Sequence, residues 1–330
     1  TEAVRGEGGK LINNIGERFM KNYDSERMEL STRDKVAIAN YKEIIEGRGT
    51  KNGGVFLDIS HKSKEFILEK IPRIYRQFLE TQMLDISKSP MEVAPTAHYS
   101  MGGILVNPTD LSTSVEGLFA AGEVAGGLHG ANRLGGNSLA EILIFGRRAG
   151  KFASLHSQEI KCQQRSKKLV QENFDKIESF IKKGDEMGRL IEDDLQKIMW
   201  THCGVVRNGN SLKKGLEKIR DLKVRFKNLD VRVGQNGFSD LSLAFSLDAS
   251  ILVAEATIIS SLAREESRGS HQRSDYPVLK SEEKCNYIIK FNDRGNLIIC
   301  KKQVPDLSPY LKEVISRTKN IDNFKNKLLE

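Results

Sequence analysis

The chain has 330 residues, of which 38% are hydrophobic and 29% are charged. A chain of this length and composition can bury sizeable apolar cores in two or three domains, which excludes an intrinsically disordered protein. The net charge is +8, but basic residues alternate with acidic ones in segments such as 161–183 and 213–227. That pattern is typical of solvated helical faces and argues against a nucleic-acid-binding surface.

The cysteines and the apolar stretches narrow the class of protein further. The four cysteines, Cys162, Cys203, Cys285 and Cys300, have no close spacing that indicates a metal site, an iron–sulfur cluster or a disulfide framework. We therefore expect a reducing, cytoplasmic environment. The longest apolar stretches are shorter than the roughly 20 residues that cross a bilayer, so we expect a soluble or at most peripheral protein.

Residues 1–96 predict a small mixed α/β domain. The chain starts without a methionine, and we interpret it as a fragment of a longer protein. β-branched and aromatic runs predict strands, and apolar residues at helical spacing predict helices that turn one face to a core. The expected elements are strands at 10–14 and 55–59 and helices at 32–46 and 63–82.

Arg33 is an unusual residue at the start of the first of these helices. The helix is expected to begin with the capping pattern Ser31-x-x-Asp34. A cation in the first turn is disfavoured by the helix dipole, by roughly 0.3 to 1 kcal/mol. Arg33 therefore either pairs with Asp34 or Glu29, or is held at this position to face a ligand.

Residues 97–155 hold the densest run of glycines, GEVAGGLHGANRLGGNSLAEILIFG at 122–146. Glycines weaken local structure unless something must approach the backbone closely. Short strands are expected at 104–106 and 117–121. The second places Glu123 at its carboxyl end, where a carboxylate can accept hydrogen bonds from ribose or ribityl hydroxyls. We interpret this stretch as the floor of a cofactor and substrate site.

A helix from Asn137 to about residue 155 follows the glycines. Ser138 is a residue type favoured at the N-cap, and the apolar Leu139, Ile142 and Leu143 predict a buried helix. Its free N–H groups and positive dipole end would then face the glycine loop. That setting suits an anionic oxygen or a reduced, electron-rich ring.

The remaining chain predicts a helical bundle and then a mixed segment. The bundle over 156–266 has helices expected at 170–182, 190–200, 212–227 and 241–264, with an inter-helix turn at 200–207. The segment 267–330 predicts a β-hairpin with strands at 287–291 and 297–301, followed by a terminal helix at 311–328.

Two side chains in irregular segments are candidates for substrate binding. His98 lies between prolines and glycines, and Arg133 lies among glycines, so each can project into a cleft. The forked guanidinium groups of Arg133 and Arg33 are suited to two carboxylates. The serines near His98 lack a GxSxG elbow, and the chain has neither metal-type histidine spacing nor a GxGxxG fingerprint.

Six strings of the sequence resemble, in order, the flavoprotein subunit of succinate dehydrogenase and fumarate reductase: TEAVRGEGG, GERFM, STRDKVA, PTAHYSMGGI, GLFAAGEVAGGLHGANRLGGNSLAE and ESRGSHQRSDYP. The resemblance implies an α+β multidomain fold, and it also implies that the first half of the FAD domain lies upstream of this chain. The implied parts are a capping α/β domain at 1–96, the second half of a Rossmann-like FAD domain at 97–155, a helical domain at 156–266 and a C-terminal segment at 267–330.

The resemblance also implies a role for each matching residue. Arg33 matches the arginine that moves a proton to or from the substrate. The relay that supplies this proton is matched by Glu2 and Arg5, and the groups that hold the dicarboxylate are matched by Thr1, His98 and Arg133. Glu123 matches the acidic residue on the ribityl chain of FAD. The backbone that faces the flavin ring is matched by Asn137, Ser138 and Leu139.

The implied function is interconversion of succinate and fumarate by hydride transfer to or from flavin N5, as in the tricarboxylic acid cycle and electron transport. The implied partner is an iron–sulfur subunit, and membrane association would be indirect, at the inner face. No nucleic acid and no metal site in this chain are expected.

Two alternatives stay open. The LDISHK string at 57–62 also resembles L-aspartate oxidase, which converts aspartate to iminoaspartate in NAD biosynthesis. The strings HYSMGG and RLGGNS favour the dehydrogenases over this oxidase. The other alternative is a flavin-free, non-catalytic fragment. The chain by itself is expected to be inactive and to bind little or no flavin.

Overall fold

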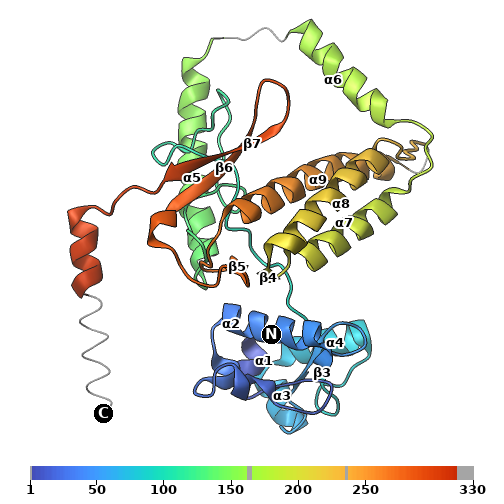
Figure 1. Ribbon diagram of the computed structural model, residues 1–330, viewed down its shortest axis with the longest axis vertical. Helices are drawn as coiled ribbons and strands as arrows, with labels where there is room; N and C mark the ends of the chain where they lie inside the picture. The colour runs from blue at the N-terminus through green and yellow to red at the C-terminus, as the bar shows by residue number, and fades with distance from the viewer. Residues whose placement is uncertain (1, 162–165, 235–236, 318–330) are drawn as a thin grey trace. The chain divides into compact units, whose positions relative to one another are not determined.

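The computed structural model describes residues 2–161, 166–234 and 237–317 (Figure 1). The chain divides into two compact units, Thr1–Leu279 and Lys280–Glu330.

The first unit begins with a three-stranded antiparallel sheet in the order β1–β2–β3. The strands are β1 (Lys10–Ile12), β2 (Val55–Asp58) and β3 (Met91–Val93). Leu57 at the centre of β2 lies opposite Leu11 on one side and Met91 on the other. The two predicted strands are confirmed. The third strand was not predicted, because three residues after Pro90 carry too short a pattern to identify a strand.

The helix that carries Arg33 is α2 (Arg33–Glu43), which continues into a π-helical turn, η3 (Ile44–Arg48). It follows a short helix, α1 (Glu2–Gly6), and two 3₁₀ turns, η1 (Phe19–Asn22) and η2 (Met28–Leu30). The predicted capping box is wrong. Thr32 occupies the N-cap without a side-chain hydrogen bond. Ser31 instead donates its hydroxyl to Asp24 Oδ2 at 2.8 Å.

The helix expected at 63–82 is two helices, α3 (Lys64–Lys70) and α4 (Pro72–Gln82). Proline lacks the N–H that a continuous helix needs, and its ring clashes with the preceding turn. Pro72 therefore ends one helix and occupies the first turn of the next, where its missing donor has no cost.

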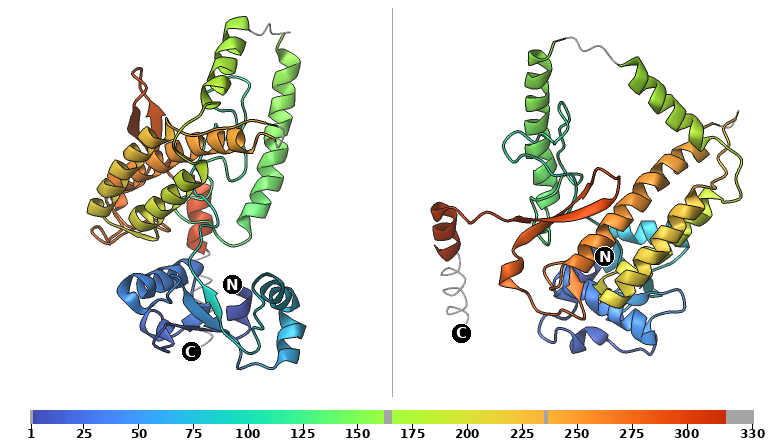
Figure 2. Two further views of the ribbon diagram at one scale, coloured as in Figure 1. Left: turned by 90° about the vertical axis from the view of Figure 1, so that its right-hand side faces the viewer. Right: turned by 45° about the horizontal axis from the view of Figure 1, so that its top comes forward.

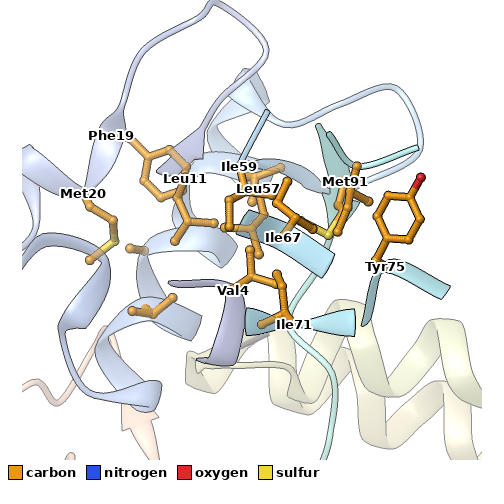
Figure 3. Packing of buried hydrophobic residues seen from close by; sticks show 14 residues of the cluster. Val4, Leu11, Phe19, Met20, Leu57, Ile59, Ile67, Ile71, Tyr75 and Met91 are labelled. Atoms are coloured by element: carbon orange, nitrogen blue, oxygen red, sulfur yellow. The ribbon is translucent and has the colours of Figure 1, made fainter. Parts of the chain in front are cut away.

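A dense apolar core joins these elements (Figure 3). Its members come from α1, α2, the sheet, the 3₁₀ turn η1 and both helices α3 and α4, so these elements share one core. The largest fully buried side chains among them are Phe19, Leu11, Met20, Leu57, Ile59, Ile67, Ile86 and Met91.

Residues 97–136 form loops, and the strands expected at 104–106 and 117–121 are wrong. Each position keeps one isolated bridge, Ile104 to Ala125 and Ser112 to Phe119. Positive φ angles at the surrounding glycines prevent longer ladders: φ is +143° at Gly103 and +82° at Gly122.

The long helix α5 (Asn137–Glu159) follows these loops. Its N-cap is Gly136, at φ +82°, and not Ser138, which lies inside the first turn. The prediction that this helix is buried is also wrong. Its apolar side chains Leu139, Ile142 and Leu143 are exposed, because nothing in the described chain covers them. The one residue of α5 that is buried is Glu141.

Four helices form the region predicted as a bundle: α6 (Lys167–Phe180), α7 (Gly188–Cys203), α8 (Gly209–Phe226) and α9 (Ser239–Ala263). Helices α7, α8 and α9 lie side by side (Figures 1 and 2) and share a core that includes Ile191, Leu212 and Ile258. Trp200 lies within α7, so the turn predicted to start there is wrong; the helix continues to Cys203 because its apolar periodicity does. Two short strands pair in parallel: β4 (Val206–Arg207) lies between α7 and α8, and β5 (Gln272–Arg273) follows α9.

Of the helices in the described ranges, α9 is the one that is long and apolar enough to cross a membrane. It packs against α7 and α8 through buried apolar side chains, including Leu247, Ile251 and Ile258. A buried core helix meets the same criteria of length and composition, so α9 is explained by the bundle.

The second unit is built on a hairpin, which confirms the prediction. A 3₁₀ turn, η4 (Ser281–Glu283), precedes β6 (Cys285–Phe291) and β7 (Leu297–Gln303), and Ile289 lies opposite Ile299. Gly295 in the connection has φ +74°. Residues 309–317 are helical. The rest of the predicted terminal helix lies outside the described residues.

Candidate functional site

The first group of candidate residues meets where α1 and α2 begin. Arg33 Nε donates to Glu2 Oε2 at 2.5 Å, although the two residues are 31 positions apart. Both side chains are more than half exposed. The two structural partners considered for Arg33 were Asp34 and Glu29. In the described chain the cation in the first turn of α2 is balanced by Glu2 instead.

Arg5 lies beside this pair and is buried. Its Nη1 donates to the backbone oxygens of Glu29 and Ser31, the second at 3.3 Å. Burial lowers the pKa of Arg5, the nearby Glu2 carboxylate raises it, and the Arg33 cation lowers it again. The charges of Glu2 and Arg33 therefore both act on Arg5.

A second group forms where two glycine-containing segments pair. Ile104 N donates to Val124 O at 2.7 Å, and Gly126 N donates to Ile104 O at 3.0 Å. A Cβ on Gly103 would lie 2.2 Å from Val124 O, so only glycine permits this approach. The pairing brings the HYSMGG segment against the GEVAGG segment.

Glu123 lies at this junction and is exposed. Its Oε1 accepts a hydrogen bond from Ser100 N at 2.9 Å. A carboxylate has about four acceptor positions, so Glu123 keeps capacity for a hydroxyl donor such as a ribityl chain.

Arg133 is held against Tyr99. Its guanidinium carbon lies 4.7 Å from the centre of the Tyr99 ring, and its Nη1 donates to Leu134 O at 3.1 Å. The Arg133 Nε atom is buried and has no hydrogen-bond partner in the described chain. A buried, unsatisfied donor costs about 1 to 3 kcal/mol. His98, the residue next to Tyr99, is exposed.

Sequence reasoning missed a polar cluster that joins the segment of Tyr99, the loop of His129 and helix α5. Glu141 Oε2 accepts a hydrogen bond from the Tyr99 hydroxyl and lies 2.8 Å from His129 Nε2. The Tyr99 and His129 rings also meet edge to face. Burial and the Glu141 carboxylate raise the pKa of Tyr99 to about 12. The available signal was a carboxylate, Glu141, within the apolar run of α5, at a spacing of one turn from Asn137.

The start of α5 suits an electron-rich or anionic group. Gly136 provides no side chain to cap the helix, so first-turn N–H groups, including that of Ser138, are left without a capping side chain. The 23-residue helix directs its positive dipole end toward the glycine loop. The start of α5 therefore offers hydrogen-bond donors, and Glu123 offers an acceptor.

The structure thus brings the candidate residues together in two groups. One consists of Glu2, Arg5 and Arg33. The other lies along residues 98–100, where Arg133 stacks on Tyr99 and Glu123 accepts a hydrogen bond from Ser100 N. Within the described ranges, no hydrogen bond or ion pair links one group to the other. Thr1 lies outside the described residues.

Two regions of the chain match models of known protein families. Residues 1–139 match the FAD binding domain family, and residues 192–304 match the family described as fumarate reductase flavoprotein C-term. The chain belongs to the fumarate reductase and succinate dehydrogenase flavoprotein family. Members of this family are oxidoreductases that use FAD, so the predicted enzyme class, fold class and cofactor are confirmed at the level of the family.

Individual relatives support the same assignment. The chain is 48% identical over 295 residues to an uncharacterized FAD-dependent oxidoreductase of Methanocaldococcus jannaschii, covering 88% of this chain and 52% of the relative. It is 38% identical to the 8-methylmenaquinol:fumarate reductase flavoprotein of Wolinella succinogenes, covering 84% and 46%. A solved structure of a FrdA variant of E. coli quinol fumarate reductase superposes with a TM-score of 0.85 at 31% identity, covering 94% of this chain and 57% of FrdA.

The chain spans about half the length of the curated relatives it matches. These relatives include named subunits of fumarate reductases, which are assemblies of more than one chain.

Proposed function

We propose that the whole protein interconverts succinate and fumarate with FAD as its cofactor. The observation that supports this proposal best is the pairing of Arg33 with Glu2 beside the buried Arg5. These are the three residues to which the family resemblance assigns proton transfer, and they form one cluster although they come from separate parts of the chain.

The dicarboxylate would be held by fixed cations and donors. Arg133 offers a guanidinium whose Nε is buried without a partner in the described chain, and its stacking on Tyr99 restricts its orientation. His98 is exposed and is next in sequence to Tyr99, the residue on which Arg133 stacks. Two anchored carboxylates fix the two central carbons of the substrate and polarise the bond between them. Thr1 is proposed as a further substrate contact.

Arg33 would transfer the proton on the carbon next to the one that exchanges hydride. A guanidinium is ordinarily always protonated, so Arg33 must be reprotonated as it reacts. Glu2 is in direct contact with Arg33 and is the group placed to return the proton, while the lowered pKa of the buried Arg5 favours its participation in the same relay.

FAD, when bound, supplies the hydride acceptor or donor. Glu123 would bind its ribityl hydroxyls, and the backbone at Asn137, Ser138 and Leu139 would face its ring at the uncapped start of α5.

Electrons would leave or arrive through a partner subunit with an iron–sulfur relay. The relatives named as subunits support a multi-chain enzyme. We propose that the protein works in the cytoplasm or at the inner face of the membrane, where its partner subunits would hold it.

The decisive variant is Arg33→Lys in the complete, FAD-loaded enzyme. Lysine keeps the positive charge but not the guanidinium geometry. We expect fumarate reduction and succinate oxidation to fall by about 10²- to 10⁴-fold, the usual contribution of a positioned acid–base group. The control is Arg27→Lys, an exposed arginine six positions earlier that should keep full activity. Full turnover by Arg33→Lys would remove this arginine from the mechanism.

Substrate preference tests the reaction itself. The complete enzyme should oxidise succinate with a dye acceptor in preference to oxidising L-aspartate with oxygen. Preference for L-aspartate would replace the proposed reaction by that of L-aspartate oxidase. The chain of 330 residues, expressed alone, should bind little or no flavin, and a stoichiometric flavin absorbance would contradict the proposed domain assignment.

A further inference from the structure

The ESRGSH string at 266–271 was part of the family resemblance, but the proposed reaction gives it no role. In the structure this segment contacts the loop that carries Arg133, which we call the arginine loop (residues 127–136). Two hydrogen bonds of this contact share one acceptor, the backbone oxygen of Ala131. Ser270 donates to it twice, from its backbone N–H at 2.9 Å and from its hydroxyl at 3.1 Å.

Gly269 makes this contact possible. Its φ is +57°, and a Cβ at this position would lie 2.3 Å from Ala131 O and 2.6 Å from the Ala131 carbonyl carbon. Atoms this close would force the two segments apart. The arginine loop has no regular secondary structure between its contacts at His129 and Arg133, so its backbone at Ala131 can shift.

The segment that contacts Ala131 is fixed by hydrogen bonds of its own. Arg268 N donates to His271 O at 2.8 Å, which closes a tight turn around Gly269 and Ser270. The fully buried Glu266 accepts hydrogen bonds from Arg268 Nε at 2.8 Å and Arg264 Nη1 at 2.7 Å. The buried Arg273 donates to Ser261 O at 2.7 Å, which ties the segment to the end of α9.

We propose that Gly269 and Ser270 are positioning residues that set the place of Arg133 through the Ala131 carbonyl. This inference rests on the proposed function, since Arg133 is the proposed carboxylate ligand. Ala131 is two residues from Arg133, so a shift of its peptide moves the guanidinium relative to Tyr99 and to any bound dicarboxylate. The segment that follows α9 thereby takes part in substrate binding without touching the substrate.

The test compares Gly269→Ala with wild type in the complete, FAD-loaded enzyme. We expect the KM for fumarate and the Kd for malonate, a dicarboxylate that cannot be reduced, to rise about tenfold, the loss expected for a misplaced charge-assisted hydrogen bond. The kcat should change much less, because Arg133 would bind substrate and transition state alike. The Ser270 amide should exchange its hydrogen faster, since its acceptor has moved.

Ser270→Ala is a milder second variant that keeps the backbone contact and leaves the fold intact. It should raise the same KM and Kd about threefold, and Ser270→Thr should restore them because it keeps the hydroxyl. Two controls separate positioning from general disturbance. Ser274→Ala removes a hydroxyl bond to Arg207 O from the same segment. Gly295→Ala places a side chain at φ +74° with open space around it. Neither should change KM.

The inference and the proposed function fail in different ways. Unchanged KM, malonate Kd and Ser270 exchange in Gly269→Ala and Ser270→Ala would overturn the positioning role while leaving the reaction in place. A wild-type enzyme without dicarboxylate binding would remove the proposed function. In that case the exchange rate of the Ser270 amide still decides whether Gly269 sets the arginine loop.

Discussion

The first 93 residues and the region from 97 to 160 carry the two halves of the candidate site, but they are held in place by different forces. The first has a dry core in which Phe19, Leu57 and Ile67 are fully buried. The second has a 23-residue helix, α5, in which the single buried residue is the carboxylate Glu141. Apolar burial orders the region that carries Arg33, whereas hydrogen bonds to a few atoms order the region that carries Arg133.

This difference has consequences for how the two regions respond to change. A hydrophobic core spreads its stabilisation over many contacts, so the backbone that it supports resists small disturbances. A hydrogen-bonded cluster concentrates stabilisation in single groups such as Glu141 and the Ala131 carbonyl. Losing one hydrogen-bond partner leaves the other partners unsatisfied. Substitutions should therefore affect stability in the first region and loop geometry in the second.

The largest effect is expected from Phe19→Ala. This change removes a fully buried ring from the core and should destabilise the first region by about 3 to 5 kcal/mol. Hydrogen exchange of the β1 and β2 amides measures the loss. Protection in α5 should stay unchanged, and a parallel loss there would show that the two regions share one core.

Glu141→Ala should act on the second region with a smaller effect. It leaves Tyr99 and His129 without their shared acceptor, at a cost of about 1 to 3 kcal/mol. The amides of Ile104 and Gly126, which join the paired loops, should exchange about 5- to 150-fold faster. Glu141→Gln keeps one acceptor oxygen and should lose less. Equal losses for both variants would mean that the hydrogen bonds are not what holds the loops.

A pH dependence should come from His271, behind the arginine loop. Burial, and next the Arg207 cation, lowers its pKa to about 4. An unfolded histidine has a pKa of about 6.5, so between these values the unfolded chain binds a proton that the folded chain does not. Stability should therefore fall as pH drops from about 6.5 to about 4.

The expected loss is on the order of 1 to 2 kcal/mol, since His271 is partly exposed. Urea unfolding followed by the fluorescence of Trp200, the single tryptophan, measures it. The variant His271→Gln should flatten this part of the pH profile. The ion pair with Arg273 lowers the pKa of Asp275 to about 2. This carboxylate therefore affects the pH dependence of stability only at lower pH.

The smallest effect is expected from Leu143→Ser. Leu143 is 73% exposed on α5, so the change should cost no more than about 0.5 kcal/mol, mostly through helix propensity. Helix content and exchange of the α5 amides provide the measurement. A loss of several kcal/mol would show that the apolar face of α5 is covered in the chain, and the contrast between the two regions would disappear.

The sequence predicted most of the elements that depend on local patterns. The strands at β1 and β2, the bundle helices and the hairpin follow from residue periodicity and turn residues, and β6 and β7 extend the predicted strands by a few residues. The resemblance also named residues that do meet, since Glu2 and Arg33 pair. The roles of these residues remain predictions.

Several features depended on contacts that no local pattern carries. Periodicity continued through Pro72, but the missing N–H divided the helix. Apolar residues in α5 predicted burial, yet burial depends on what covers a face, and the described chain leaves Leu143 exposed. The cluster of Tyr99, His129 and Glu141 joins positions 42 residues apart, and Ser270 reaches Ala131 across 139 residues. Sequence thus determined the elements and the candidate residues, while tertiary structure alone decided which polar groups meet, because hydrogen bonds depend on distances in space.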